Sequence, residues 1–380
     1  MAYAQLLKAE FESVGVKDVK ITDKGIVMAY LPATEGLETM PAMGLIAHMD
    51  TSPEASGEPA QWQVLNYQGG DIVLNKDKNI VLSLERFPGV AKYAGEQLVV
   101  TDGTTLLGAD DKAGIAIIVE TARYFVEHPE IPHAKLCFAV TPDEEVGRGT
   151  ENFDIEEFGA QYAYTFDGDE LGGFETETFN AAMVKVHFEG LNVHPGSAKN
   201  KMVNAIRMAM DFIARLPAES APEKTEGHEG FFHPMGISGA VRGVDLKMLI
   251  RDHSNSRFED RMNYVRKMVE EMNKVWGDRV TADIKVQYHN LKNYLDKHPA
   301  VCELAREAYR RIGVEIHEKP VRGGTDGARL SAKGLPTPNL FTGGMNYHGV
   351  YECLSVTGIQ RALDLGIMLG KMSAEVKTLD

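Results

Sequence analysis

The sequence predicts an α/β fold in which a domain built on a mostly parallel, mixed sheet flanked by helices is interrupted by a smaller domain. Strand-like and helix-like segments alternate in the first half of the chain, which is typical of a parallel sheet with helices on its faces. The middle third has a different order of elements, and the final part returns to alternation. We therefore expect the final part to rejoin the first sheet.

Three apolar runs in the first half predict buried strands: AMGLIAHMD at 42–50, KLCFAVTPDEE at 135–145 and YAYTFDGD at 162–169. Continuous apolar runs of this length are typical of strands that are covered on both faces. Between the first two runs, KAGIAIIVETARYFVEH at 112–128 has apolar residues at helical spacing and predicts a helix.

The middle third predicts a separate domain with the order strand, helix, strand, strand, helix, strand. The expected strands are 181–189, 235–243, 245–253 and 281–289, and the expected helices are 201–215 and 256–275. This βαββαβ order is the ferredoxin-like pattern. The predicted domains are therefore 1–178 with 292–380, and the inserted domain 179–291.

Composition excludes several classes of protein. The formal net charge of −15 argues against a nucleic acid partner, because phosphate binding needs clustered Lys and Arg. Only three cysteines occur, far apart, so neither a disulfide framework nor a thiolate zinc site is indicated. No apolar run approaches the roughly 20 residues of a membrane-spanning helix, and the first residues do not form a signal peptide. We expect a cytoplasmic protein with no membrane contact.

Polar residues follow the apolar strands at their carboxyl ends. The clusters are His48 with Asp50, Asp110 with Asp111, Asp143–Glu145, Asp167, and His348 after the apolar segment 335–341. In open α/β sheets ligands bind outside the carboxyl ends of the strands, so clusters that are distant in sequence can meet there. Histidines and carboxylates without cysteine suit zinc or manganese at a catalytic site.

Charge counting favours two metal ions. Two divalent cations would balance three ligating carboxylates and one free carboxylate, and a bridging carboxylate would hold the ions about 3.5–4 Å apart. An acid in the Gly-flanked turn that contains Asp110 and Asp111 could reach both cations. Each cluster alone has a plainer explanation: His48 as an ordinary hydrogen-bonded residue, and Asp143–Glu145 as a solvated helix start. The prediction rests on the clusters together.

Several long segments resemble the peptidase T family, the tripeptide aminopeptidases. They are IAHMDTSPE, DGTTLLGADDKAG, FAVTPDEEVGRG, AYTFDGD, NVHPGSAK, VRGGTDGARLS and PNLFTGGMNYHG, and the similarity runs over nearly the whole chain. That family belongs to the dizinc peptidases that also include carboxypeptidase G and the acyl-amino-acid deacylases. The resemblance implies a catalytic α/β domain interrupted by a ferredoxin-like lid, in agreement with the elements above. Family members begin upstream of Met1, so we expect the first helix to be only partly represented here.

The resemblance also implies the metal ligands. His48, Asp110 and Asp167 would hold one zinc ion, and Asp110, Glu145 and His348 would hold the other, with Asp110 as the bridge. Manganese or cobalt could substitute for the two zinc ions. In this family the peptide bond after the bridging aspartate is cis, so we expect a cis bond after Asp110.

Further roles carry over from the same resemblance. Asp50 would orient the first histidine ligand, as metal-bound imidazoles usually need a second partner. Glu144 would be the general base. In the lid, His194 would donate a hydrogen bond to the oxyanion, and Arg251, with Arg322 as a weaker candidate, would pair with the carboxylate of the peptide.

The resemblance predicts a dizinc aminopeptidase that hydrolyses the N-terminal residue from tripeptides, with a short peptide as substrate and a homodimer as a possible assembly. The first alternative is a related dizinc amidohydrolase that acts on other short peptides or on N-acyl amino acids with the same metal site. The second is a non-catalytic binding protein on the same scaffold. That alternative expects a lost ligand or a lost base, and the matched ligands and the base are all present.

Overall fold

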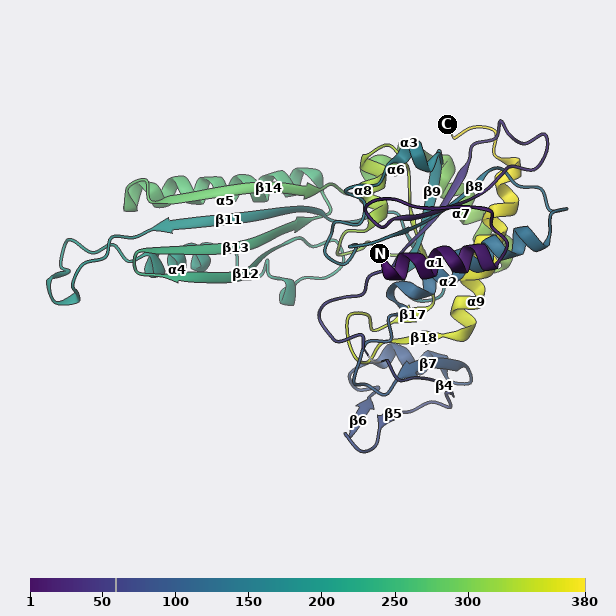
Figure 1. The fold of residues 1–380 in the computed structure, drawn as a ribbon. Coiled ribbons are helices and arrows are strands. Elements are labelled where there is room, and N and C mark those ends of the chain that lie inside the picture. The colour runs from purple at the N-terminus through teal and green to yellow at the C-terminus, as the bar shows by residue number, and fades with distance from the viewer. Residues whose placement is uncertain (59, 380) are drawn as a thin grey trace. The chain divides into compact units, whose positions relative to one another are not determined.

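The computed structural model describes residues 1–58 and 60–379 and divides the chain into two compact units (Figure 1). The larger unit comprises Met1–Thr176, Tyr294–Lys319 and Thr325–Asp380, and the smaller unit comprises Glu177–Asn293 and Pro320–Gly324. The boundaries predicted from sequence, at 178/179 and 291/292, differ in that they place Pro320–Gly324 in the larger domain. These predicted domain boundaries stay a prediction. No helix in the described part of the chain is long and apolar enough to span a membrane.

An eight-stranded mixed sheet forms the centre of the larger unit, in the order β1-β2-β8-β3-β9-β16-β10-β15. Its strands are β1 (Asp18–Ile21), β2 (Val27–Leu31), β3 (Met43–His48), β8 (Leu136–Thr141), β9 (Tyr162–Gly168), β10 (Gly173–Glu175), β15 (His317–Glu318) and β16 (Asn339–Phe341). The central strands β8, β3, β9 and β16 pair in parallel, whereas β1, β2 and β8 pair in antiparallel. The predicted fold class, and the return of the final segment to the first sheet, are confirmed.

Helices cover both faces of this sheet. They are α1 (Ala2–Ser13), α2 (Ala109–Glu127), α3 (Ile155–Phe158), α7 (Pro299–Ile312), α8 (Asp326–Ala332) and α9 (Val356–Met372), and the short helix α6 (Lys292–Leu295) lies where the chain passes from the smaller unit to the larger. Neighbouring residues of a strand point to opposite faces. Cys137 of β8 accordingly packs in one cluster with Phe158 of α3 and Leu330 of α8, whereas Phe138 contacts Phe11 of α1.

Each of the three predicted strands of the first half is present, and each is shorter than its apolar run. β3 ends at His48, β8 at Thr141 and β9 at Gly168. The polar residues that follow β3 and β8 therefore lie in loops beyond the sheet. The predicted helix 112–128 is α2, which follows Gly108 in the left-handed conformation (φ 73°).

A second sheet was not predicted from the sequence. Its order is β17-β18-β7-β4, formed by β4 (Trp62–Asn66), β7 (Gln97–Thr101), β17 (Gly344–Met345) and β18 (Cys353–Ser355), and the hairpin β5 (Ile72–Asn75) and β6 (Ile80–Leu82) lies between β4 and β7 in sequence. Because β18 pairs with β7, this sheet joins the two sequence-distant parts of the larger unit.

The smaller unit has the predicted βαββαβ order. Its elements are β11 (Asn180–Glu189), α4 (Ala205–Arg215), β12 (Phe231–Ala240), β13 (Gly243–Asp252), α5 (Asn255–Trp276) and β14 (Val280–Tyr288). The antiparallel strand order β12-β13-β11-β14 is that of a ferredoxin-like sheet. Strand β12 begins at Phe231, four residues before the predicted start at residue 235. The prediction began too late because His233 and Pro234 interrupt the apolar pattern from which a strand is recognised in the sequence.

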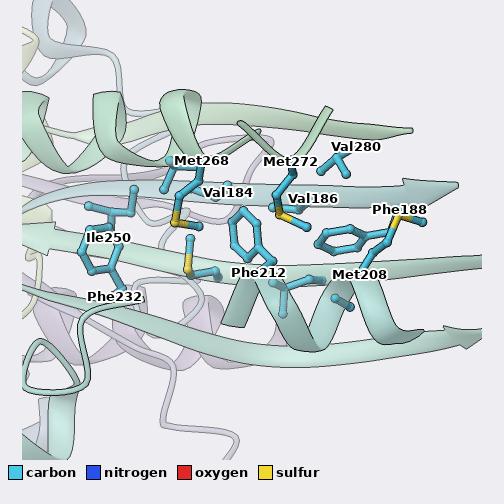
Figure 2. Close-up of a cluster of buried hydrophobic side chains, with 14 of the residues drawn as sticks. Val184, Val186, Phe188, Met208, Phe212, Phe232, Ile250, Met268, Met272 and Val280 are labelled. Carbon is cyan, nitrogen blue, oxygen red and sulfur yellow. The ribbon is translucent and has the colours of Figure 1, made fainter. Parts of the chain in front are cut away.

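The core of the smaller unit lies between one face of its sheet and both helices (Figure 2). Alternate residues of β11, Val184, Val186 and Phe188, point into it. Phe212 of α4 is fully buried there and contacts Phe188 with ring centroids 5.7 Å apart. One sheet face is therefore covered by helices.

We expect Phe212→Ala to destabilise the smaller unit by about 3–5 kcal/mol, because it removes a buried ring and leaves a cavity. The free energy of unfolding is measured by guanidinium denaturation, followed by the fluorescence of Trp276, which packs against this core. All variants carry Trp62→Phe, so that Trp276 is the remaining tryptophan. Met210→Ala on the same helix is the control, since Met210 is 64% exposed. Equal losses in the two variants would contradict this account of the core.

Candidate active site

The structure brings the predicted metal ligands together at the carboxyl ends of the central strands. His48 is the last residue of β3, Asp167 lies near the end of β9, Glu145 follows β8, Asp110 lies in the first turn of α2, and His348 lies between β17 and β18. All belong to the larger unit. The parallel pairing of β8, β3 and β9 explains why these ends coincide.

The carboxylate of Asp110 faces both imidazoles with different oxygen atoms. Its Oδ1 lies 2.8 Å from His48 Nε2, and its Oδ2 lies 3.2 Å from His348 Nε2. His48 Nε2 is also 3.3 Å from Asp167 Oδ1, and His348 Nε2 is 3.1 Å from Glu145 Oε2. The arrangement consists of two groups, each with one imidazole and one further carboxylate, that share Asp110.

Asp111, the neighbour of Asp110, holds backbone in place. It also lies within ligand distance of His48 and Asp167. However, its Oδ2 accepts the N–H of His48 (3.0 Å) and its Oδ1 accepts the N–H of Gly114 (3.1 Å). A Cβ on Gly114 would lie 2.4 Å from Asp111 Oδ1, so only glycine allows this approach. The peptide bond between Asp110 and Asp111 is cis, as predicted.

Asp50 connects the first histidine to the loop that carries both glutamates. One of its oxygens, Oδ1, lies 3.3 Å from His48 Nδ1 and accepts the N–H of Glu144 at 3.0 Å. The other, Oδ2, accepts the N–H of Glu145 at 3.0 Å. Asp50 is thus placed to fix both the imidazole and the main chain of the two glutamates.

Three further buried polar residues beside the site were missed by sequence reasoning. Asn339 Oδ1 accepts the N–H of Asp167 at 3.1 Å, and Glu352 accepts the N–H of Asp110 at 2.9 Å. Asp326 accepts the hydroxyl of Thr141, at the end of β8, at 2.8 Å. Each lies in or directly after a segment that carries the family resemblance, which was the only sequence signal for them.

The electrostatics reflect many acids in a small buried space. Hydrogen bonds from His348 to the carboxylates of Asp110 and Glu145 raise the pKa of His348 to about 10. Burial raises the pKa of Asp167 to about 7, against the lowering effect of His48. Burial also raises the pKa of Glu144 well above its usual value, and the charge of Asp167 adds to that effect. Divalent cations reverse this balance, because they stabilise ionised carboxylates and neutral imidazoles.

The donor set fits metal ions. Imidazole and carboxylate ligands without thiolate suit zinc and other divalent first-row metals. The candidate ligand atoms lie within 4.8 Å of one another in the groups of His48, Asp110 and Glu145 and of His48, Asp111 and Asp167. Within the described residues, Glu145 Oε1 is buried and has no hydrogen-bond partner, which leaves it available to a cation.

In the smaller unit, His194 lies at the start of an exposed turn. Its Nδ1 accepts the N–H of Gly196 at 3.1 Å. An accepting Nδ1 requires the proton of a neutral imidazole on Nε2, so Nε2 is the donor. This tautomer is the one that a hydrogen bond to an oxyanion requires.

Arg251, at the end of β13, has no acidic partner in the smaller unit. It donates from Nη1 to the hydroxyl of Tyr288 and lies over that ring, with its Cζ 5.4 Å from the centroid. Its Nε is buried without a partner among the residues that are described. The neighbouring acid Asp252 is bound by Arg257 and Arg261 instead.

Arg322 is more fully engaged. Its Nη1 donates to the carbonyls of Gly227 (2.9 Å) and Glu229 (2.8 Å), and its Nη2 donates to Thr225 Oγ1 (2.7 Å). Its guanidinium also lies 5.1 Å from the ring centroid of Phe179. These bonds give Arg322 a role in holding the smaller unit together, and its role toward a substrate stays a prediction.

Comparison with known proteins adds to this geometry. A family model described as a peptidase dimerisation domain matches residues 176–277. Peptidase T of Clostridium acetobutylicum is 49% identical over 371 residues, which cover 97% of this chain and 91% of that protein. Peptidase T of Geobacillus kaustophilus is 47% identical over 371 residues, which cover 97% and 90%. The chain belongs to the peptidase T family. A crystal structure of the aminopeptidase PepT from Bacillus cereus, 25% identical, matches with a TM-score of 0.78 over 97% of this chain and 92% of that one.

For this peptidase T family member we expect zinc binding to strengthen as pH rises from about 6 to about 8. Ligand imidazoles must lose their protons to bind a metal. Hydrogen bonds to Asp110 and Glu145 raise the pKa of His348 to about 10, and although burial lowers the pKa of His48, the charge of Asp167 and a hydrogen bond to Asp110 raise it overall, so both imidazoles hold a proton more strongly than a free histidine. Calorimetric titration with zinc in buffers of different ionisation enthalpy measures the protons released.

The control for this experiment is His128→Ala, a half-exposed histidine at the end of α2, which should leave proton release unchanged. His348→Ala should reduce the release. An affinity for zinc that does not change with pH would contradict the assignment of the imidazoles as ligands.

Proposed function

We propose that the chain is a dizinc aminopeptidase that removes the N-terminal residue from tripeptides. One observation carries the proposal: in a member of the peptidase T family, Asp110 directs one carboxylate oxygen to His48 (2.8 Å) and the other to His348 (3.2 Å). A carboxylate in this position can bridge two cations, which is the arrangement of two-metal hydrolases.

The proposed ligands form two sets that share Asp110. His48 and Asp167 complete the first set, and Glu145 and His348 complete the second. Bound zinc ions would polarise the scissile carbonyl and lower the pKa of an attacking water. Manganese or cobalt could replace zinc, since imidazole and carboxylate ligands accept each of them.

Glu144 is the proposed general base. It takes a proton from the attacking water and returns it to the leaving amine. Glu144 is buried beside Asp167 and Asp110, and both proton transfers need such a carboxylate within reach of the water and of the leaving amine. Asp50 binds the N–H groups of Glu144 and Glu145, so the two neighbouring side chains have separate fixed directions.

The smaller unit is proposed to recognise the rest of the peptide. His194 would donate from Nε2 to the oxyanion, and Arg251 would pair with the terminal carboxylate. Recognition of the terminal carboxylate by Arg251 would favour peptides over substrates that lack this group. The match of residues 176–277 to a dimerisation domain supports a homodimer. Arg322 as a second carboxylate partner and a cytoplasmic location stay predictions.

We expect Glu144→Gln to keep its metal and to lose turnover by about 10²–10⁴-fold, because it preserves size and removes the proton acceptor. Elemental analysis and steady-state hydrolysis of a tripeptide measure the two properties. Glu151→Gln, an exposed acid of the same loop, is the matched control. Loss of metal in Glu144→Gln would show that Glu144 is a ligand, so that the two glutamates have exchanged roles.

We expect Arg251→Ala to lower kcat/KM for a tripeptide. The loss of transition-state stabilisation should be about 2–5 kcal/mol, the cost of losing a buried charge-assisted pair. It should scarcely affect a tripeptide amide, which has no terminal carboxylate. Arg242→Ala, in the exposed turn that joins β12 and β13, controls for a change of net charge. Equal losses on both substrates would remove Arg251 from the substrate site.

The proposal as a whole is tested by metal analysis joined to a substrate panel. Two zinc ions per chain and preference for tripeptides over dipeptides, tetrapeptides and N-acyl amino acids are the expected results. Preference for N-acyl amino acids would indicate a related amidohydrolase. Two bound zinc ions without turnover of any substrate in the panel would indicate a binding protein.

A further inference from the structure

Glu352 is a buried acid whose two oxygens bind the turn that carries Asp110. Its Oε2 accepts the N–H of Gly108 at 2.7 Å, and its Oε1 accepts the N–H of Asp110 at 2.9 Å. Glu352 is only 2% exposed and stands 242 residues from Asp110 in the sequence. Bonds from backbone N–H groups to a buried carboxylate are short and strong, and they fix main-chain position.

The segment Asn346–Glu352, here called the closing segment, also carries His348. Its shape is fixed internally, because Asn346 Nδ2 donates to the carbonyl of Tyr351 (3.2 Å) and the N–H of Glu352 donates to the carbonyl of Gly349 (3.1 Å). Asn346 and His348 both adopt left-handed backbone angles, with φ of 58° and 63°. Such conformations in residues other than glycine persist only where surrounding contacts enforce them.

Asp110 is therefore held twice by the closing segment. His348 Nε2 lies 3.2 Å from its carboxylate, and Glu352 holds its N–H. We propose that Glu352 is a positioning residue for the bridging carboxylate, and that binding of the second of the two metal ions depends on its two bonds to the turn at Gly108–Asp110. The inference rests on the proposed metal pair and not on the proposed substrate.

A carboxylate is needed at this position for a geometric reason. Glu352 meets two N–H donors with two acceptor oxygens, whereas a glutamine has one acceptor oxygen and would direct its own N–H₂ at the second donor. Gly108 adopts a left-handed backbone (φ 73°), a conformation that favours glycine and that the bond from its N–H to Glu352 helps to hold.

Glu352→Gln therefore separates positioning from general stability. Zinc binding, measured by competition with a chromophoric chelator, should retain its first equivalent and lose about 10–100-fold in affinity for the second. The rise in Tm that zinc produces should shrink, because ligand stabilisation follows affinity. A purely structural role would lower the Tm of the metal-free and zinc-loaded forms equally and leave zinc affinity unchanged.

Two further variants serve as the negative and the positive control for Glu352→Gln. Asp154→Asn is the matched control, since Asp154 accepts one backbone N–H, that of Glu157, at the start of α3. Asp110→Ala shows the effect of losing the bridge itself. If Glu352→Gln does not fold, Glu352→Asp keeps the charge, is too short to reach both donors, and should show the same selective loss of the second zinc.

The outcomes separate this inference from the proposed function. Wild-type protein that fails to bind two zinc ions overturns the proposed metal pair. Wild-type protein that binds two, together with a Glu352→Gln variant of the same affinity, overturns only the role of Glu352. If neither Glu352→Gln nor Glu352→Asp folds even with zinc present, the inference is also overturned, because Glu352 would then be required for the fold and not for the metal positions.

Discussion

The site depends on one kind of interaction, in which the backbone N–H of a proposed ligand is bound by a side-chain oxygen from a different segment of the chain. His48 donates to Asp111, Asp110 to Glu352, Glu145 to Asp50, and Asp167 to Asn339, at 3.0, 2.9, 3.0 and 3.1 Å. Where a strand ends or a helix begins, backbone N–H groups lose the regular partners of the sheet or helix, so those that are buried must find other acceptors. These bonds fix the main chain of the ligands while their own side chains stay directed toward one another.

The same device explains the large number of acids. Some carboxylates, such as Asp111 and Glu352, use both oxygens on backbone donors, whereas Asp110 presents both oxygens to imidazoles. Both sets are buried close together. Burial raises the pKa of Asp111 and of Asp167, and the charges of neighbouring carboxylates raise it further. Bringing ionised acids together in this way is costly unless a cation offsets their repulsion. Metal binding and folding of these loops are therefore expected to support one another.

The sequence predicts those parts of the molecule that have a local signal. β3, β8 and β9 are continuous apolar runs, and α4 and α5 have helical periodicity, so all five were predicted. The sheet β17-β18-β7-β4 was not, because its strands are short and β18 pairs with β7 from a distant part of the chain. Adjacent acids give no signal of their separate roles either. Spacing cannot say that Asp110 faces the imidazoles and Asp111 the backbone, since that depends on the local main-chain path.

Hydrogen-bond capacity separates two arginines that look alike in the sequence. Arg322 has acceptors for both protons on Nη1 and for one on Nη2, all within the smaller unit. Arg251 lies near the end of β13, and among the described residues it has no acidic partner and a buried Nε without a hydrogen-bond partner. A buried donor left unsatisfied costs about 1–3 kcal/mol, and Tyr288 satisfies only a different nitrogen. A substrate carboxylate would satisfy that nitrogen, which makes Arg251 a stronger candidate than Arg322 for this contact, and the role of Arg251 stays a prediction.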